Sequence, residues 1–317
     1  MVIGDNMKDL KVVFMGTPNF SVPVLEALIE SCNVIGVVTQ PDSVFNNVTK
    51  ESPIKQLAKK NDILVLQPED IRKNFDQVID LKPQIIITCA YGQIIPKELL
   101  EYPDYGCINV HASLLPKLRG GAPIHRAIIN GYEKTGITIM FMNEKMDAGD
   151  IISQAEINIE NEDNVKTVHD KLSLLGKELL IKTLPDIISS NIKRIKQVES
   201  EATFAYTIKR EDEKINFDKT KREIYNKIRG LSPWPGAYCL FDGKICKVYT
   251  SRVGDKHYNN NVYGEIMNLY DDGIGINVVN GEIIFTEIQL EGKKKMLVKD
   301  FLNGVQKKED LVGKILE

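Results

Sequence analysis

The chain has 317 residues, of which 43% are hydrophobic and 27% are charged, and its formal net charge at pH 7 is -3. A chain of this length can form two domains, each with its own hydrophobic core, and the small net charge argues against a strongly cationic nucleic-acid coat protein. Residues 207–317 carry a small excess of basic over acidic residues, which is compatible with an anionic partner.

The cysteines and the N-terminal sequence indicate the cellular compartment in which we expect this protein. The five cysteines are an odd number and form no C-x-x-C pair, so we expect reduced, buried thiols and a cytoplasmic protein. No apolar run approaches the ~18 residues that a helix needs to span a bilayer. The N-terminal sequence MVIGDNMKDL is too polar for a signal peptide.

The first half of the chain alternates short apolar strands with helical segments. This alternation predicts a Rossmann-like α/β fold with a doubly wound, mainly parallel sheet. The turn Gly16-Thr17-Pro18 after the first strand lacks the G-x-G-x-x-G and G-x-x-x-x-G-K-[ST] patterns, so we expect no dinucleotide or nucleoside triphosphate site there. The expected strands lie at 11–15, 34–39, 63–66 and 84–89, and the expected helices lie at 20–29 and 52–60.

The second half has a different pattern. A helix is expected at 165–189, and a polar, weakly patterned stretch follows it. Beyond residue 206, short strands separated by Gly-centred turns predict a small β-barrel, of which the oligonucleotide-binding barrel is one type. The expected elements of this part are a helix at 221–229 and strands at 237–241, 244–250, 264–269, 275–279 and 282–290. The predicted organisation is a first domain over residues 1–190, a linker over 191–206 and a β-barrel domain over 207–317.

The central stretch, residues 106–150, holds the polar residues best placed for chemistry. A short strand leads to Asn109 and His111, and a second strand at 136–142 leads to Asp147. Ligands collect beyond the carboxyl ends of strands in an open parallel sheet, so we expect these three side chains to share one site. An amide, an imidazole and a carboxylate suit the attack of a nucleophile on a carbonyl carbon, with Asn and His stabilising the oxyanion and Asp managing protons.

Other interpretations of the same residues stay open at this level. Taken singly, an Asn, a His or an Asp at the end of a strand is more often a turn or capping residue. Covalent catalysis is less well supported, because Ser113 lacks the G-x-S-x-G elbow and Cys107 lies in an apolar strand. A zinc site is not expected, because His111 and His125 have neither an H-E-x-x-H motif nor paired cysteines nearby.

The order of motifs along the chain resembles one family. The pattern N-x-H-x-S-L-L-P-x-x-R-G-x-x-P followed by D-x-G, which begins at Asn109, is specific to formyltetrahydrofolate-dependent formyl transfer. Over about residues 8–315 the chain closely resembles the methionyl-tRNA formyltransferase family. The further motifs that carry the resemblance are FMGTP at 14–18, VVTQPD at 37–42, SPIKQLA at 52–58, AYGQIIP at 90–96 and SPWP at 232–235.

The resemblance implies a reaction and a site. The reaction is the transfer of a formyl group from 10-formyltetrahydrofolate to the α-amino group of methionine esterified to initiator tRNA, for the initiation of protein synthesis. It implies no metal, and it suggests a monomer. The implied catalytic residues are Asn109, His111 and Asp147, and the implied folate-binding residues are Ser113, Leu114, Leu115 and Pro116.

The resemblance also implies a surface for tRNA. In the family, the β-barrel domain and a basic loop of the first domain hold the tRNA, but this chain has at that position a shorter segment, 43–50, whose only basic residue is Lys50. Charge runs of this size are commonly solvated faces rather than phosphate contacts. The remaining tRNA-binding candidates are Arg119, Lys209, Arg210, Lys293, Lys294 and Lys295.

Two other functions stay as alternatives. One is a folate-dependent formyltransferase that acts on a small-molecule amine, such as an amino sugar nucleotide; the missing basic loop favours it and the SPWP-bearing domain opposes it. The other is a non-catalytic RNA-binding protein, which the intact set of Asn109, His111 and Asp147 opposes.

Overall fold

The computed structural model describes residues 7–45 and 48–317. Residues 1–6, at the start of the polar N-terminus, and residues 46–47, at the centre of the 43–50 segment, lie outside the described residues. The chain divides into two compact units. The first comprises residues 1–123, 135–158 and 169–206, and the second comprises residues 124–134, 159–168 and 207–317.

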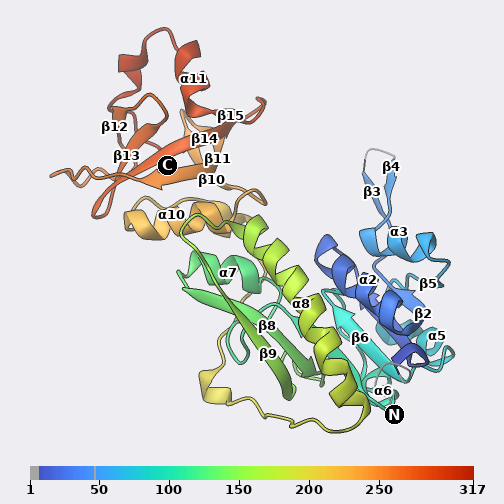
Figure 1. Ribbon diagram of the computed structural model, residues 1–317. Helices are drawn as coiled ribbons and strands as arrows, with labels where there is room; N and C mark the ends of the chain where they lie inside the picture. The colour runs from blue at the N-terminus through green and yellow to red at the C-terminus, as the bar shows by residue number, and fades with distance from the viewer. Residues whose placement is uncertain (1–6, 46–47) are drawn as a thin grey trace. The chain divides into compact units, whose positions relative to one another are not determined.

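The first unit is built on one seven-stranded sheet. Its strands are β1 (Lys11–Gly16), β2 (Asn33–Val38), β5 (Val65–Leu66), β6 (Ile85–Cys89), β7 (Cys107–His111), β8 (Lys134–Phe141) and β9 (Ile151–Asn158). They lie in the order β5-β2-β1-β6-β7-β8-β9. In Figure 1 the labelled strands β5, β2 and β6 lie toward one side of this unit and β8 and β9 toward the other. The five strands from β5 to β7 run parallel, which confirms the mainly parallel α/β fold expected from the sequence.

Strand β8 runs antiparallel to β7, which differs from the parallel arrangement expected from the sequence. Ile108 of β7 lies opposite Phe141, and His111 lies opposite Thr138. The carboxyl end of β8 therefore lies beside the start of β7, away from the end that carries His111. The expectation that Asp147 leaves a parallel strand end was wrong, because the loop after β8 has to fold back along β7 to reach the site.

Helices join the strands of the first unit and cover its sheet. Ser52 caps the helix expected at 52–60, because its hydroxyl accepts a hydrogen bond from the Lys55 amide and Pro53 occupies the first helical position. Ser21 precedes a helix without capping it; its hydroxyl instead donates to the Cys89 carbonyl oxygen at 2.5 Å and ties the helix start to β6. These helical elements are η1 (Asn19–Ser21), α2 (Val22–Ser31), α3 (Pro53–Lys60), α4 (Ile71–Asn74), α5 (Asp76–Ile79), α6 (Lys97–Glu101), α8 (Val165–Ile188) and η2 (Glu199–Glu201).

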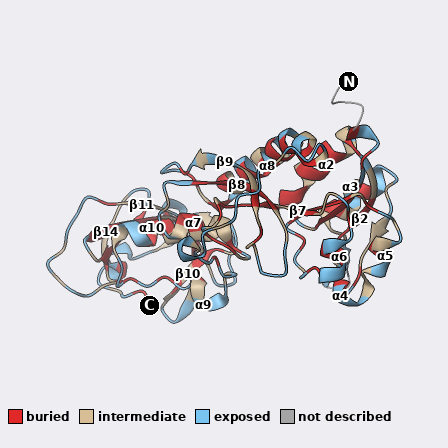
Figure 2. Cartoon of the chain, turned by 90° about the horizontal axis from the view of Figure 1, so that it is seen from below, coloured by how far each residue is buried: buried red, intermediate tan, exposed pale blue. Residues whose placement is uncertain are grey.

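The core of the first unit is the sheet itself. In Figure 2 the ribbon of β7 is coloured as buried over most of its length, and every residue of β6 is buried. A separate two-stranded hairpin, β3 (Ser43–Phe45) with β4 (Val48–Lys50), carries the exposed side chains of Val44 and Val48.

The stretch after α8, residues 191–206, is fixed to the first unit by backbone hydrogen bonds. Ile195 exchanges two of them with Ile151 at the start of β9, at 2.8 and 2.9 Å. Further along, the Thr203 carbonyl oxygen accepts from the Arg119 amide at 2.9 Å. The polar segment expected to act as a linker thus runs beside the loop that follows β7.

The second unit contains a six-stranded antiparallel sheet. Its strands are β10 (Ala237–Phe241), β11 (Lys244–Val253), β12 (Ile266–Leu269), β13 (Ile274–Val278), β14 (Gly281–Leu290) and β15 (Met296–Leu297). They follow the order β10-β11-β14-β13-β12, with β15 paired to β14. The helical elements of this unit are α7 (Pro123–Ile129), α9 (Arg210–Glu213), α10 (Lys221–Gly230), α11 (Val298–Gly304) and η3 (Lys308–Leu311).

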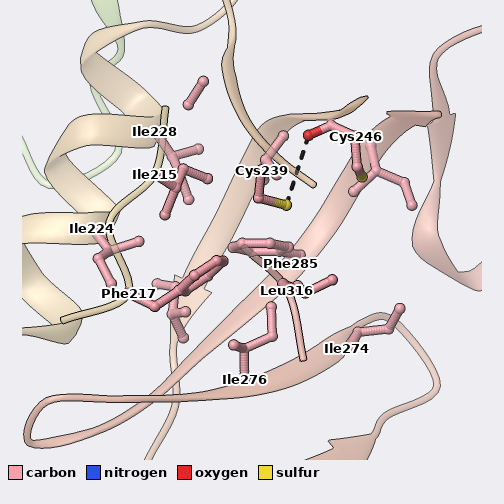
Figure 3. Packing of buried hydrophobic residues seen from close by; sticks show 14 of the residues in the cluster. Ile215, Phe217, Ile224, Ile228, Cys239, Cys246, Ile274, Ile276, Phe285 and Leu316 are labelled. Atoms are coloured by element: carbon pink, nitrogen blue, oxygen red, sulfur yellow. Dashed lines mark hydrogen bonds between the residues drawn. The ribbon is translucent and has the colours of Figure 1, made fainter. Parts of the chain in front are cut away.

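A hydrophobic cluster fills the space between this sheet and α10 (Figure 3). Phe217 and Phe285 meet with ring centroids 6.3 Å apart. Ile224 and Ile228 point from α10 toward the strands (Figure 3). Their spacing of four residues places both side chains on one face of the helix, so a single apolar stripe anchors α10 on the sheet.

The last residues of the chain close this sheet into a barrel. The Leu316 amide donates to the Gly264 carbonyl oxygen at 2.9 Å, so the tail extends the β12 edge. Glu317 exchanges two hydrogen bonds with Leu240 of β10, at 2.6 and 3.0 Å. Because β12 and β10 are the two ends of the strand order, the tail joins both edges and produces the small β-barrel expected from the sequence.

Among the helices of the described chain, none combines the length and the apolar character that crossing a bilayer requires.

Candidate active site

The site is centred on the carboxylate of Asp147. The Asp147 Oδ1 atom lies 3.6 Å from His111 Nδ1 and 3.5 Å from Asn109 Nδ2. Asn109 and His111 lie two residues apart on β7, so their side chains leave the same face of the strand. The structure therefore brings together the three residues that the sequence singled out.

The imidazole of His111 is buried and faces two different partners. Its Nε2 atom lies 3.1 Å from the Leu118 carbonyl oxygen. A carbonyl oxygen only accepts, so Nε2 carries the hydrogen of this bond and Nδ1 is the nitrogen turned toward Asp147. The 3.6 Å separation on the Nδ1 side leaves that nitrogen less tightly held than Nε2.

Asn109 is oriented by a residue that the sequence did not single out. The buried Thr88 hydroxyl, near the end of β6, donates to Asn109 Oδ1 at 2.9 Å. With its oxygen occupied, the amide turns its NH2 group toward Asp147. The available signal was a Thr in the otherwise apolar strand IIITC, which places a hydroxyl beside β7.

The loop that carries Asp147 is held in an uncommon conformation. Asp147 has φ = 49°, in the left-handed region. Its Oδ2 atom accepts a hydrogen bond from the Gly120 amide at 2.8 Å. A Cβ atom at Gly149 would lie 1.8 Å from the Phe141 carbonyl oxygen, so only glycine fits at the position that ends the D-x-G motif.

Cysteine chemistry fits this site poorly. Cys107 begins β7 and is 2% exposed, and burial raises the pKa of its thiol to about 12. A thiol with this pKa is protonated near neutral pH and is a weak nucleophile.

Among the described residues, no group of three or more His, Cys, Asp or Glu side chains is arranged to hold a metal ion.

The four residues expected to bind folate form a rigid turn after β7. The Thr138 hydroxyl donates to the Ser113 carbonyl oxygen at 2.6 Å and accepts from the Leu115 amide at 3.1 Å. Ser113 and Leu115 are buried, whereas Leu114 and Pro116 are half-buried. Ser113 and Leu115 thus set the shape of the turn, and Leu114 and Pro116 present its apolar surface.

The basic residues expected to contact tRNA differ widely in exposure. Arg119 is 3% exposed, and its guanidinium is bonded to Gln197 and Glu199. This environment fits a role in fixing the loop better than a contact to phosphate, which needs an accessible guanidinium.

The other candidates lie in the second unit, and all are exposed. Arg210 is paired with Glu213 and lies over the Tyr238 ring. Lys295 is paired with Glu287 at 3.0 Å. Lys209 Nζ lies 3.7 Å from Glu211 Oε1 and the Lys209 side chain is 71% exposed, and Lys293 and Lys294 are also exposed.

Comparison with known proteins is consistent with this architecture. The family description "Formyl transferase" matches residues 10–184, and "Formyl transferase, C-terminal domain" matches residues 207–306. A methionyl-tRNA formyltransferase of Bacillus cytotoxicus is 52% identical over 306 residues, which are 94% of this chain and 96% of that protein.

Two solved structures share the fold at low identity. A methionyl-tRNA formyltransferase from Clostridium thermocellum has a TM-score of 0.53 at 19% identity and covers 77% of this chain and 94% of its own. WlaRD, a sugar 3N-formyl transferase solved in the presence of dTDP and 5-N-formyl-THF, has a TM-score of 0.64 at 21% identity and covers 90% and 99%. The family matches and the identity to the Bacillus protein over nearly the whole chain decide the assignment: the chain belongs to the methionyl-tRNA formyltransferase family.

Proposed function

We propose that this protein transfers the formyl group of 10-formyltetrahydrofolate to the α-amino group of methionyl initiator tRNA. The observation that carries the proposal is the convergence of Asn109, His111 and Asp147 on one carboxylate-centred site. The identity of half or more to methionyl-tRNA formyltransferases supports the choice of acceptor.

In the proposed reaction the neutral amine of methionine attacks the formyl carbon. A new C–N bond forms, and the bond between the formyl carbon and N10 of the folate breaks after a tetrahedral intermediate with an oxyanion. The amine loses one proton and N10 gains one, so the products are formylmethionyl-tRNA and tetrahydrofolate. No metal is required for this balance.

In this proposal Asn109 and the protonated form of His111 donate hydrogen bonds to the developing oxyanion, because with Nε2 bonded to the Leu118 carbonyl oxygen only the imidazolium has a hydrogen on Nδ1 to donate. The Asn109 NH2 group is available, because its 3.5 Å contact to Asp147 is long and Thr88 already holds the amide oxygen. On His111, the nitrogen that the protein holds less tightly is Nδ1. One donor of this kind contributes about 3–4 kcal/mol to transition-state stabilisation in other enzymes.

Asp147 orients His111 and takes the proton that the attacking amine loses. Both roles fall to Oδ1, which faces Asn109 and His111, while Oδ2 accepts from the Gly120 amide and fixes the carboxylate. A carboxylate held in this way is pre-positioned for general-base catalysis.

The turn 113–116 fits a folate co-substrate in one respect. Leu114 and Pro116 offer the half-buried apolar surface that a planar ring system needs, and the turn beneath them is fixed by Thr138. The folate supplies the activated formyl group.

For the tRNA, we assign phosphate contacts to the exposed Lys209, Lys293 and Lys294. A monomeric, cytoplasmic enzyme is part of the same proposal.

A comparison of acceptors tests the proposal. Purified protein is given 10-formyltetrahydrofolate with methionyl initiator tRNA, or with an amino sugar nucleotide at matched concentration. Formylation of the tRNA alone is expected. Formylation of the amino sugar nucleotide alone would assign the chain to small-molecule chemistry, and no transfer to either acceptor would contradict catalysis.

A further inference from the structure

The side chain of Gln197 spans the turn that carries Asp147. Its Nε2 atom donates to the Asp147 carbonyl oxygen at 2.9 Å and to the Gly149 carbonyl oxygen at 2.8 Å. Both amide hydrogens are therefore used on carbonyls two residues apart in one turn. Gln197 comes from the segment between α8 and the second unit, about 50 residues beyond Asp147 in the sequence.

The other end of the same amide is held by Arg119. Gln197 Oε1 accepts from Arg119 Nε at 3.0 Å, and Arg119 Nη1 donates to both carboxylate oxygens of Glu199, at 3.1 and 3.0 Å. Only the oxygen of the amide can accept from a guanidinium, and only its nitrogen can donate to carbonyls. The orientation of Gln197 is thus fixed from both ends.

Together with one further hydrogen bond, these bonds form a closed ring that passes through Asp147, Gln197 and the Arg119-Gly120 dipeptide. Arg119 is followed directly by Gly120, whose amide donates to Asp147 Oδ2 at 2.8 Å. The same dipeptide therefore holds the Asp147 side chain directly and its backbone through Gln197. The backbone bonds of Arg119 with Thr203 and Ala205 keep the dipeptide beside the Gln197 segment.

The backbone of Asp147 has a reason to need this support. Its φ of 49° lies in the left-handed region, which is uncommon for residues other than glycine, although Asp enters it more readily than most. The carbonyls of Asp147 and Gly149 have a donor in Gln197. If it were lost, the turn could relax toward ordinary backbone angles, and the carboxylate would move away from His111.

We propose that Gln197 is a positioning residue for the Asp147 carboxylate and that Arg119 holds Gln197 in place. The proposal deepens the function above and rests on the proposed catalytic role of Asp147. It also assigns a function to residues 191–206 of the first unit: this segment acts on the reaction by holding the turn that carries Asp147.

The test replaces Gln197 by Met, which has a similar length but cannot donate a hydrogen bond. Turnover should fall about tenfold or more, the scale typical of lost supporting hydrogen bonds, while KM for tRNA and for 10-formyltetrahydrofolate changes less than about threefold. Val198→Met is the matched control, because it changes the adjacent exposed residue of the same segment and should leave turnover unchanged. An unchanged kcat in Gln197→Met would overturn the proposal.

A double-mutant cycle separates this proposal from the role of Asp147. If Gln197 acts through the carboxylate, Gln197→Met should cause little further loss in an Asp147→Asn background. The same fold-loss in both backgrounds would overturn the positioning role and leave the role of Asp147 intact. Near-normal turnover of Asp147→Asn alone would instead overturn the catalytic role of Asp147, on which this proposal rests, while formyl transfer itself would still stand.

A folding control keeps the result interpretable. The thermal midpoints of Gln197→Met and Val198→Met are compared with that of the unmodified protein. If Gln197→Met does not fold, Gln197→Glu is used, which keeps an acceptor for Arg119 and removes both donors to the turn. Gln197→Glu should show the same loss of kcat, and normal turnover in that folded variant would overturn the proposal.

Discussion

The Gly120 amide donates a hydrogen bond to Asp147 Oδ2 at 2.8 Å. One residue follows β7 and the other follows β8, and the bond places the carboxylate of the second loop against the backbone of the first. It leaves Oδ1 free to face His111 and Asn109. Position 120 requires glycine for a different reason: its φ is 119°, and an added Cβ would lie 2.8 Å from the Ala205 carbonyl oxygen.

Gly120→Ala should reduce both stability and turnover. Gly120 has φ = 119°, and a Cβ atom there would lie 2.8 Å from the Ala205 carbonyl oxygen, so the backbone must shift and weaken its bond to Asp147. We expect a loss of about 1–3 kcal/mol in the free energy of unfolding and a lower kcat, measured by urea denaturation and a formyl-transfer assay. Gly243→Ala is the control, since Gly243 also has a positive φ but no atom lies within 4 Å of its added Cβ; it should keep full turnover. Equal kinetics in the two variants would contradict the assignment.

Thr88→Val should weaken the site through Asn109. Valine has nearly the same shape, but it removes the donor that holds Asn109 Oδ1 at 2.9 Å. The expected cost is about 1 kcal/mol of stability, together with a decrease in kcat because the Asn109 amide loses its fixed orientation.

The control for Thr88 is Thr135→Val in β8. Thr135 is also buried, but its hydroxyl has no hydrogen-bond partner among the described residues, so its removal should cost little in either measurement. A normal kcat in Thr88→Val would show that Asn109 does not need this bond.

Cys107 should affect the pH dependence of stability but not the reaction. Burial raises the pKa of its thiol from 9.0 to about 12. The neutral thiol is favoured in the folded state, so this stabilisation is present below pH 9 and is lost as the pH rises toward 12, by up to about 1.4 kcal/mol per pH unit.

Cys107→Ala provides the measurement. Its unfolding free energy should fall less steeply between pH 9 and 11 than that of the unmodified protein, while kcat at neutral pH stays within about twofold, because a protonated thiol takes no part in the transfer. A large loss of turnover would reopen covalent catalysis by Cys107.

The closure of the barrel predicts a contrast between two adjacent residues of the tail. Leu316 is 6% exposed, whereas Ile315 is 53% exposed. Leu316→Ala should cost about 2–5 kcal/mol in the stability of the second unit, and Ile315→Ala should cost much less. Comparable costs would show that the tail does not close the barrel through its buried side chain.

Periodicity and turn residues were enough to predict most elements of the fold. The strands and helices of both units fall close to their expected positions, because alternating apolar runs and Ser-Pro starts act locally. The direction of β8 was not predictable in this way, since nothing in its own sequence distinguishes a parallel from an antiparallel neighbour. The tail at 313–317 was missed for a similar reason, because its pairing with β10 and β12 is set only in three dimensions.

The residues of the candidate site could also be predicted only where residue type and spacing along the chain identify them. Asn109, His111 and Asp147 could be named from residue type and spacing. Thr88 and Gln197 could not, because their importance lies in which polar atom each one faces. From composition alone, residues 191–206 were predicted to be a linker. In the structure their backbone forms hydrogen bonds with β9 and with the loop after β7.

The catalytic role of Asp147 is tested most directly by the single-turnover rate of Asp147→Asn with 10-formyltetrahydrofolate and methionyl initiator tRNA. Asparagine keeps the size of the side chain and can still accept from the Gly120 amide, but it cannot take a proton from the attacking amine. We expect a rate at least about 100-fold lower, with an unchanged thermal midpoint and little change in tRNA binding. A rate within a few-fold of the unmodified protein would contradict this role.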